Sequence, residues 1–150
     1  MSKLLFAICT FVVIANLAQL SHGCSCEAPD FRRQFCRSKY AAVITVDRPT
    51  TRNDDGLYAA YKFTTRTVLA ANDEDSERVL LGSQIIHVRR RKTSCAADLQ
   101  PGTTYVIYGQ PSSDGRIVAT ACNAIAYDFL TDEERAEIER YSQKGLPCRR

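Results

Sequence analysis

Polar and apolar side chains alternate along much of this chain, which is the pattern of half-buried β-strands. The longest example is residues 57–69, where Phe63 and Leu69 share one face while Lys62 and Arg66 lie on the other. Segments rich in Gly, Pro, Asn and Asp separate such stretches and predict turns. The predicted strands, about five in all, are 40–46, 57–69, 80–88, 103–108 and 116–122. The acidic segment 70–78 is predicted to be a loop.

One helix is predicted near the C-terminus, over residues 131–142. Thr131 and Glu134 have the spacing of a capping box, in which a threonine caps the helix and a glutamate three residues later bonds back to it. Ile138 and Tyr141 provide a narrow apolar face. Five short strands and one helix most resemble a small Greek-key barrel of the oligonucleotide/oligosaccharide-binding (OB) type. A β-sandwich is the alternative, because strand patterns alone do not choose between them.

The first 23 residues have the features of a secretory signal peptide. Lys3 precedes an apolar run from Leu4 to Ala18, and the small residues around Gly23 form a plausible cleavage site. The run is too short and too weakly flanked to predict a membrane span. We therefore expect a secreted, extracellular protein. Removing 23 of the 150 residues leaves 127, enough for one domain with its own core.

The cysteines give the strongest chemical signal in the chain. Of the seven, Cys9 belongs to the predicted signal peptide, which leaves an even number for disulfides. They are Cys24, Cys26, Cys36, Cys95, Cys122 and Cys148. Six cysteines allow 15 pairings. Cys24 and Cys26 point the same way in an extended segment, so both are expected to reach distant partners. Cleavage after Gly23 would also place a free α-amine on Cys24. Without that placement, a purely structural disulfide framework would be the favoured interpretation.

Charge and histidine content argue against several classes of function. The formal net charge is only +3, which gives no electrostatic case for nucleic-acid binding, and no membrane partner is expected. The basic run from Arg89 to Lys92 is interpreted as a solvated strand edge rather than a binding patch. His87 is the only histidine after residue 23. With all remaining cysteines paired, neither a Cys–His nucleophile nor a His/Cys metal cluster could form, so we do not expect an enzyme.

The cysteine pattern resembles the N-terminal, netrin-like domain of the tissue inhibitors of metalloproteinases. The shared residues are Cys24-Ser25-Cys26 at the expected mature N-terminus and Phe35-Cys36 after it. The resemblance covers residues 24–148, leaves 149–150 as a tail, and is nearest to the single-domain members of invertebrates such as nematodes. It implies a mainly β fold, a five-stranded OB-fold-like Greek-key barrel with flanking helices. It also implies three disulfides, which are Cys24–Cys95, Cys26–Cys122 and Cys36–Cys148.

The resemblance further implies a mechanism of inhibition. The α-amine and carbonyl oxygen of Cys24 would bind the zinc of a target proteinase of the matrix metalloproteinase type, and the protein would need no cofactor of its own. Zinc in such enzymes keeps one coordination position open. Cys24 to Glu27 would lie in the catalytic cleft, with Ser25 at the mouth of a substrate pocket. Thr93 and Ser94 would line a second contact segment beside them.

The chain also departs from the family pattern near this edge. Glu27 and Asp30 place carboxylates in or near the contact segment, and the basic run 89–92 precedes the second one. These changes predict an altered or weakened preference among proteinases. They also leave an alternative function open: a secreted netrin-like module that binds a receptor or another cell-surface or matrix protein, with an immunomodulatory role, and does not inhibit proteinases.

Overall fold

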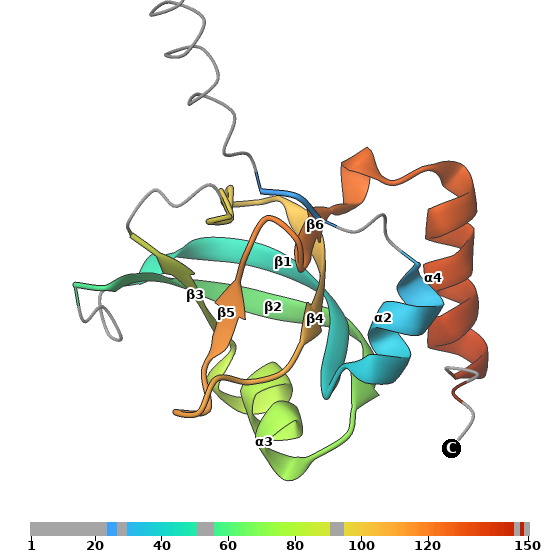
Figure 1. Ribbon diagram of the computed structural model, residues 1–150, viewed down its shortest axis with the longest axis horizontal. Coiled ribbons are helices and arrows are strands. Elements are labelled where there is room, and N and C mark those ends of the chain that lie inside the picture. Colours follow the sequence, from blue (N-terminus) through green and yellow to red (C-terminus); the bar gives the residue numbers. More distant parts are fainter. Residues whose placement is uncertain (1–23, 27–29, 51–55, 91–94, 146–147, 149–150) are drawn as a thin grey trace, which may run out of the picture.

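The computed structural model describes residues 24–26, 30–50, 56–90, 95–145 and 148. The predicted signal peptide therefore lies outside the described residues. Six strands form one curled sheet in the order β5-β3-β2-β1-β4-β6 (Figure 1). The strands are β1 (Tyr40–Thr50), β2 (Tyr58–Ala71), β3 (Ile85–Arg89), β4 (Thr104–Gly109), β5 (Ile117–Ala119) and β6 (Ala124–Ala126). All neighbours are antiparallel except β3 and β5, which are parallel.

The mainly β, OB-fold-like architecture is confirmed, with one strand more than predicted. Of the predicted strand 116–122 only β5 (Ile117–Ala119) is a strand, and the additional strand β6 follows it after a turn. The two short strands lie at opposite edges of the sheet. Between them the side chain of Asn123 accepts a hydrogen bond from the backbone N–H of Thr120, at 2.7 Å. The turn separates β5, which pairs with β3, from β6, which pairs with β4.

Residues 40–46 of β1 are largely buried on both faces, and this explains why that part of the strand is nearly continuously apolar. Ala42, Ile44 and Val46 face the interior of the barrel. Ala41 and Val43 belong to a second core that forms between the sheet and two helices. Three register shifts along the β1–β2 pair bend these long strands. The same pair of strands can therefore contribute side chains to both cores.

Two helices cover the second core. Helix α2 (Phe31–Arg37) and helix α4 (Asp132–Lys144) lie on the same side of the sheet (Figure 1). Phe35 of α2 is fully buried, and its ring meets those of Tyr108 and Tyr141 edge-on at 5.7 and 6.2 Å. Ile138 and Tyr141, the predicted apolar face of α4, are both buried there.

The capping box of α4 is confirmed. The Thr131 hydroxyl accepts a hydrogen bond from the Glu134 backbone N–H, and the Glu134 carboxylate accepts one from the Thr131 N–H. Replacing Thr131 with alanine should lower the free energy of unfolding by about 1 kcal/mol, because the Glu134 N–H loses its side-chain acceptor. Urea denaturation measures this, and Thr131→Ser is the control that should stay near wild type. Equal stability of T131A and wild type would contradict the expectation.

Two expectations for the region after β2 are wrong. Residues 70–78 are not a loop, because β2 continues to Ala71 and helix α3 (Glu74–Glu77) follows. Residues 80–84 are not strand, because Arg78–Ser83 forms a π-helix, η1. The side chain of Asp73 caps α3 by accepting from the Ser76 N–H at 2.8 Å. Leu80 still reaches the barrel core, but from η1 rather than from a strand.

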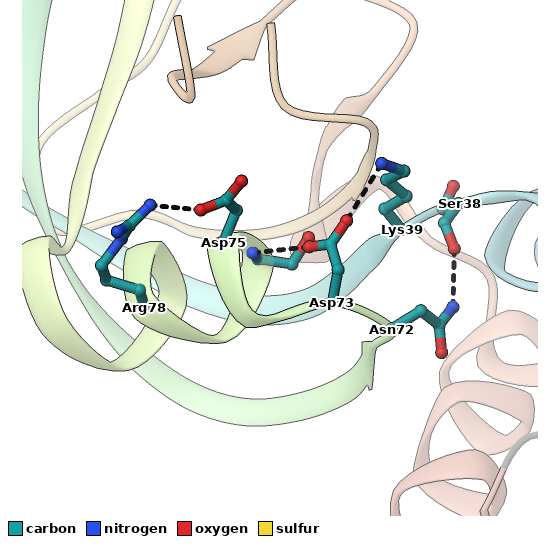
Figure 2. A network of polar contacts seen from close by, with 7 residues as sticks. Ser38, Lys39, Asn72, Asp73, Asp75 and Arg78 are labelled. Atoms are coloured by element: carbon teal, nitrogen blue, oxygen red, sulfur yellow. Dashed lines mark hydrogen bonds and ion pairs between the residues drawn. The ribbon is translucent and has the colours of Figure 1, made fainter. Parts of the chain in front are cut away.

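A polar network connects the start of β1 to the start of α3 (Figure 2). Lys39 forms an ion pair with Asp73 at 3.1 Å, and the Asn72 amide donates to the Ser38 carbonyl at 2.9 Å. The hydroxyl and backbone N–H of Ser76, followed by the Lys39 ammonium, lower the pKa of the Asp73 carboxyl to about 2. The network therefore favours the ionised form of Asp73 in the folded protein.

This lowered pKa predicts an acid-dependent loss of stability. Because the folded-state pKa of Asp73 is below its unfolded value, the stabilisation is complete above about pH 4 and is lost as the pH falls through about 2. We expect Asp73→Asn to reduce the pH dependence of unfolding in this range. Urea midpoints measured between about pH 4 and about pH 2 test this, with Glu74→Gln as the control on the same helix. Identical slopes in wild type and D73N would contradict it.

Candidate functional site

The predicted contact segment begins at a short stretch of surface chain that two disulfides attach to the barrel. Cys24 bonds to Cys95 and Cys26 bonds to Cys122, with Cα–Cα distances of 4.9 and 5.2 Å. These are the pairs that the family resemblance implies. Cys24 is half-buried, whereas Ser25 and Cys26 are exposed. The segment therefore combines an exposed surface with fixed attachment at both of its cysteines.

The two disulfides pack against each other. The sulfur of Cys24 lies 3.3 Å from that of Cys122, although these two cysteines are not bonded to each other. The three sulfurs of Cys24, Cys26 and Cys122 all lie within 4.8 Å of one another. Each is already in a disulfide, so none is a thiolate that could ligate a metal. The cluster is thus a covalent anchor for the N-terminal segment.

Hydrogen bonds from the sheet hold the partner cysteines in place. The phenol of Tyr108, on β4, donates to the Cys122 carbonyl at 2.6 Å. The backbone N–H of Ala121 donates to the Cys95 carbonyl at 3.0 Å, and Ala96 forms a β-bridge with Thr120. Burial raises the pKa of the Tyr108 phenol, so it remains a donor well above neutral pH. The positions of both anchors are therefore set by the barrel itself.

Sequence reasoning did not identify Tyr108 or Asn123 as part of this site. Asn123 stabilises the turn before β6, since its amide accepts from Thr120 and donates to the Val118 carbonyl at 3.1 Å. Neither residue belongs to a motif, and Tyr108 looks like any other strand aromatic in the sequence. The position of Asn123 next to Cys122 was the one available signal.

The remaining predicted contact residues cannot be placed in the same way. Glu27, Thr93 and Ser94 lie outside the described residues, as do Arg91 and Lys92. The structure does bring Cys95, which follows Ser94, to the N-terminal segment through its disulfide with Cys24. Asp30 is the N-cap of α2 and accepts from the Arg33 N–H at 2.9 Å.

The third disulfide lies away from this segment. Cys36, in α2, bonds to Cys148, with a Cα–Cα distance of 5.4 Å. This is also the pair that the resemblance implies, and it connects α2 to the chain that follows α4. The disulfide closes the longest interval of the three, 112 residues, so it restricts the unfolded chain strongly. Removing this disulfide therefore serves as a control for removing a disulfide at the N-terminal segment.

His87 and the basic residues near it are placed by β3. His87 is buried, and its ring lies edge-on to that of Tyr58 at 6.2 Å. Arg89 and Arg90 follow at the exposed end of the strand. On the neighbouring strand edge the Arg116 guanidinium lies over the Tyr58 ring at 5.6 Å. The structure thus places basic side chains from two parts of the chain around Tyr58.

Comparison with known proteins supports the fold assignment. Among the described residues, no helix has both the length and the apolar character needed to cross a membrane. No curated protein matches the chain. The family model for the UNC-6/NTR/C345C module matches residues 33–137, which is well over half of the 150-residue chain. Modules of this netrin-like family are typically extracellular, rich in disulfides and without catalytic activity. The chain therefore belongs to the UNC-6/NTR/C345C module family.

Proposed function

We propose that this protein is a secreted inhibitor of zinc metalloendopeptidases of the matrix metalloproteinase type. The observation that carries the proposal is the N-terminal segment, in which Ser25 is exposed between two cysteines that are both disulfide-bonded to the barrel. A segment held in this way loses little conformational freedom when it enters a cleft. Such preorganisation increases affinity because the cost of ordering the segment is met during folding.

In this proposal the α-amine and carbonyl oxygen of Cys24 bind the proteinase zinc together and displace its water. Catalytic zinc sites keep one position open for water or substrate and can expand to five ligands, so the amine would replace the water and the carbonyl oxygen would add a fifth ligand. An α-amine has an ordinary pKa of about 7.7–8.0, so its neutral donor form is accessible near neutral pH. Ser25 to Glu27 would lie in the catalytic cleft, and Thr93 and Ser94 would line a second contact segment beside them.

The proposal requires that the mature protein begin at Cys24. Mass spectrometry of protein secreted from animal cells tests this requirement directly. The function test then compares inhibition of a panel of matrix metalloproteinases by protein with a verified Cys24 N-terminus and by protein with one additional N-terminal alanine. A mature N-terminus at any other residue, or equal inhibition by the two forms, would refute zinc binding by Cys24.

The second candidate function is a netrin-like binding module for a cell-surface or matrix protein. The observation that favours it is the set of basic side chains around Tyr58, namely exposed Arg89 at the end of β3, exposed Arg90 just after it, and Arg116 before β5. Under this function, charge reversal at Arg89 and Arg90 would weaken binding to cells or matrix. The additional N-terminal alanine would leave that binding unchanged.

A further inference from the structure

A groove of about 580 Å³ opens between two segments of chain that follow or include partner cysteines of the N-terminal segment. One of its walls is the chain from Ala121 to Phe129, which includes β6, and the other is the loop that follows Cys95. The two walls therefore begin at the partner cysteines of Cys26 and Cys24. Its apolar lining residues are Tyr105, Ala121, Ala124, Ile125, Ala126 and Phe129. The groove thus lies between two segments of chain whose cysteines are disulfide-bonded to the segment that carries Ser25.

Phe129 projects from the edge of this groove. Its side chain is 86% exposed, more than any other large apolar side chain in the described part of the chain. Scattered surface apolar residues are ordinary, but this one adjoins an apolar groove and so extends it. In Figure 1, β6, which leads to Phe129, lies beside the Cys24–Cys26 segment at the upper end of the barrel. Helix α3 lies at the opposite end.

The turn that carries Phe129 is firmly held. The 3-10 helix η2 (Tyr127–Phe129) ends at Leu130, which is buried. The Arg135 guanidinium donates to the carbonyls of Tyr127 and Asp128 at 3.3 and 3.2 Å, and it lies over the Tyr127 ring. Because the residues around it are fixed, Phe129 is presented to solvent by a preorganised turn, as a contact residue would be.

The opposite wall is fixed as well. The Tyr105 phenol accepts from the Gln100 N–H at 2.9 Å and donates to the Asp98 carbonyl at 3.3 Å. Asp98 and Asp128 are exposed residues that line the groove, one on each wall. Within the described part of the chain, neither carboxylate forms an ion pair with another residue. The groove therefore combines apolar lining residues with an exposed aspartate on each wall.

We propose that this groove is a second contact surface for the metalloproteinase that the N-terminal segment inhibits. It receives a projecting segment from the rim of the catalytic cleft that carries an apolar side chain next to a lysine or arginine. The apolar side chain packs against Phe129 and the groove floor, and the cation lies between Asp98 and Asp128. This inference rests on the proposed function, and it assigns selectivity among proteinases to residues outside the zinc-binding segment.

The test uses the full-length mature protein and the catalytic domain of the matrix metalloproteinase that wild type inhibits most tightly. Phe129→Ser should raise the inhibition constant at least about tenfold, because buried aromatic contacts dominate interface energies. Asp98→Asn combined with Asp128→Asn should slow association several-fold at low salt, with a smaller effect at high salt. The matched controls are Leu81→Ser, an exposed apolar residue of η1, and Glu74→Gln on α3, and both should leave inhibition unchanged.

Each outcome separates the inference from the function on which it rests. If wild type does not inhibit any proteinase of the panel, both the proposed function and the groove contact are refuted. If wild type inhibits and F129S has the same inhibition constant and thermal midpoint as wild type, only the groove contact is refuted. If L81S weakens inhibition as much as F129S does, the effect is not specific to the groove, and this too refutes the inference.

Discussion

One additional alanine before Cys24 is expected to weaken inhibition of matrix metalloproteinases by about a thousandfold or more, equivalent to about 4 kcal/mol of binding free energy. The added residue converts the α-amine of Cys24 into an amide, whose nitrogen has no lone pair available for zinc. The extension also occupies the space that the metal would need. The measurement is the inhibition constant of the extended and native proteins against the same enzyme panel.

The extension should not affect the fold, so any difference in inhibition constant between the two forms can be attributed to the N-terminus. Ser25 and Cys26 are exposed and Cys24 is only half-buried, so one more residue can extend into solvent. The thermal midpoints of the two forms should therefore agree. Inhibition by neither form would instead favour the second candidate function, binding to a cell-surface or matrix protein through the basic residues around Tyr58. Retained inhibition by the extended form would exclude the amine as a zinc ligand.

Removing one anchor of the N-terminal segment is expected to have the second-largest effect. In the double variant Cys26→Ser with Cys122→Ser, the segment keeps only its attachment at Cys24 and regains conformational freedom on the side of Ser25. We expect its inhibition constant to rise about ten- to a hundredfold, because the segment must then be ordered on binding. Replacing both cysteines avoids an unpaired thiol, and inhibition assays measure the change.

The double variant Cys36→Ser with Cys148→Ser provides the matched control. That disulfide closes a loop of similar length, 112 residues compared with 96, so both losses should lower the free energy of unfolding by about 2–4 kcal/mol. Cys36 is in α2 and Cys148 follows α4, away from the N-terminal segment. Inhibition should therefore survive in this variant below its unfolding temperature. Equal loss of inhibition in both variants would mean that global stability, not preorganisation, determines affinity.

Several elements could be predicted because their signals are local. The capping box at Thr131 depends on residues three positions apart, and its bonds form as predicted. The alternation along β2 likewise places Phe63 in the core and leaves Lys62 exposed. The π-helix η1 could not be predicted in this way. Leu80 and the residues after it read equally well as a buried strand, because a short apolar run has no distinct period.

For the candidate site, the residues indicated which cysteines mattered but left their pairing open. The family resemblance selected one pairing of the 15, and the same three pairs are present in the structure. Tyr108 and Asn123, which position Cys122, carried no recognisable signal. Their role depends on β4 and β6 being neighbours, and this follows from the topology of the sheet rather than from any local pattern.

The sequence by itself determined the exposed and buried sides of most strands, the helix that ends the fold, and an N-terminal cysteine pair suited to reach distant partners. Only the tertiary structure decided how β1 serves two cores, where the cysteines anchor that pair, and that Phe129 borders a groove next to it. The physical reason is the separation along the chain between the residues that interact. Capping and alternation depend on neighbours within a few residues, whereas the site joins segments separated by 71 and 96 residues through the curvature of the sheet.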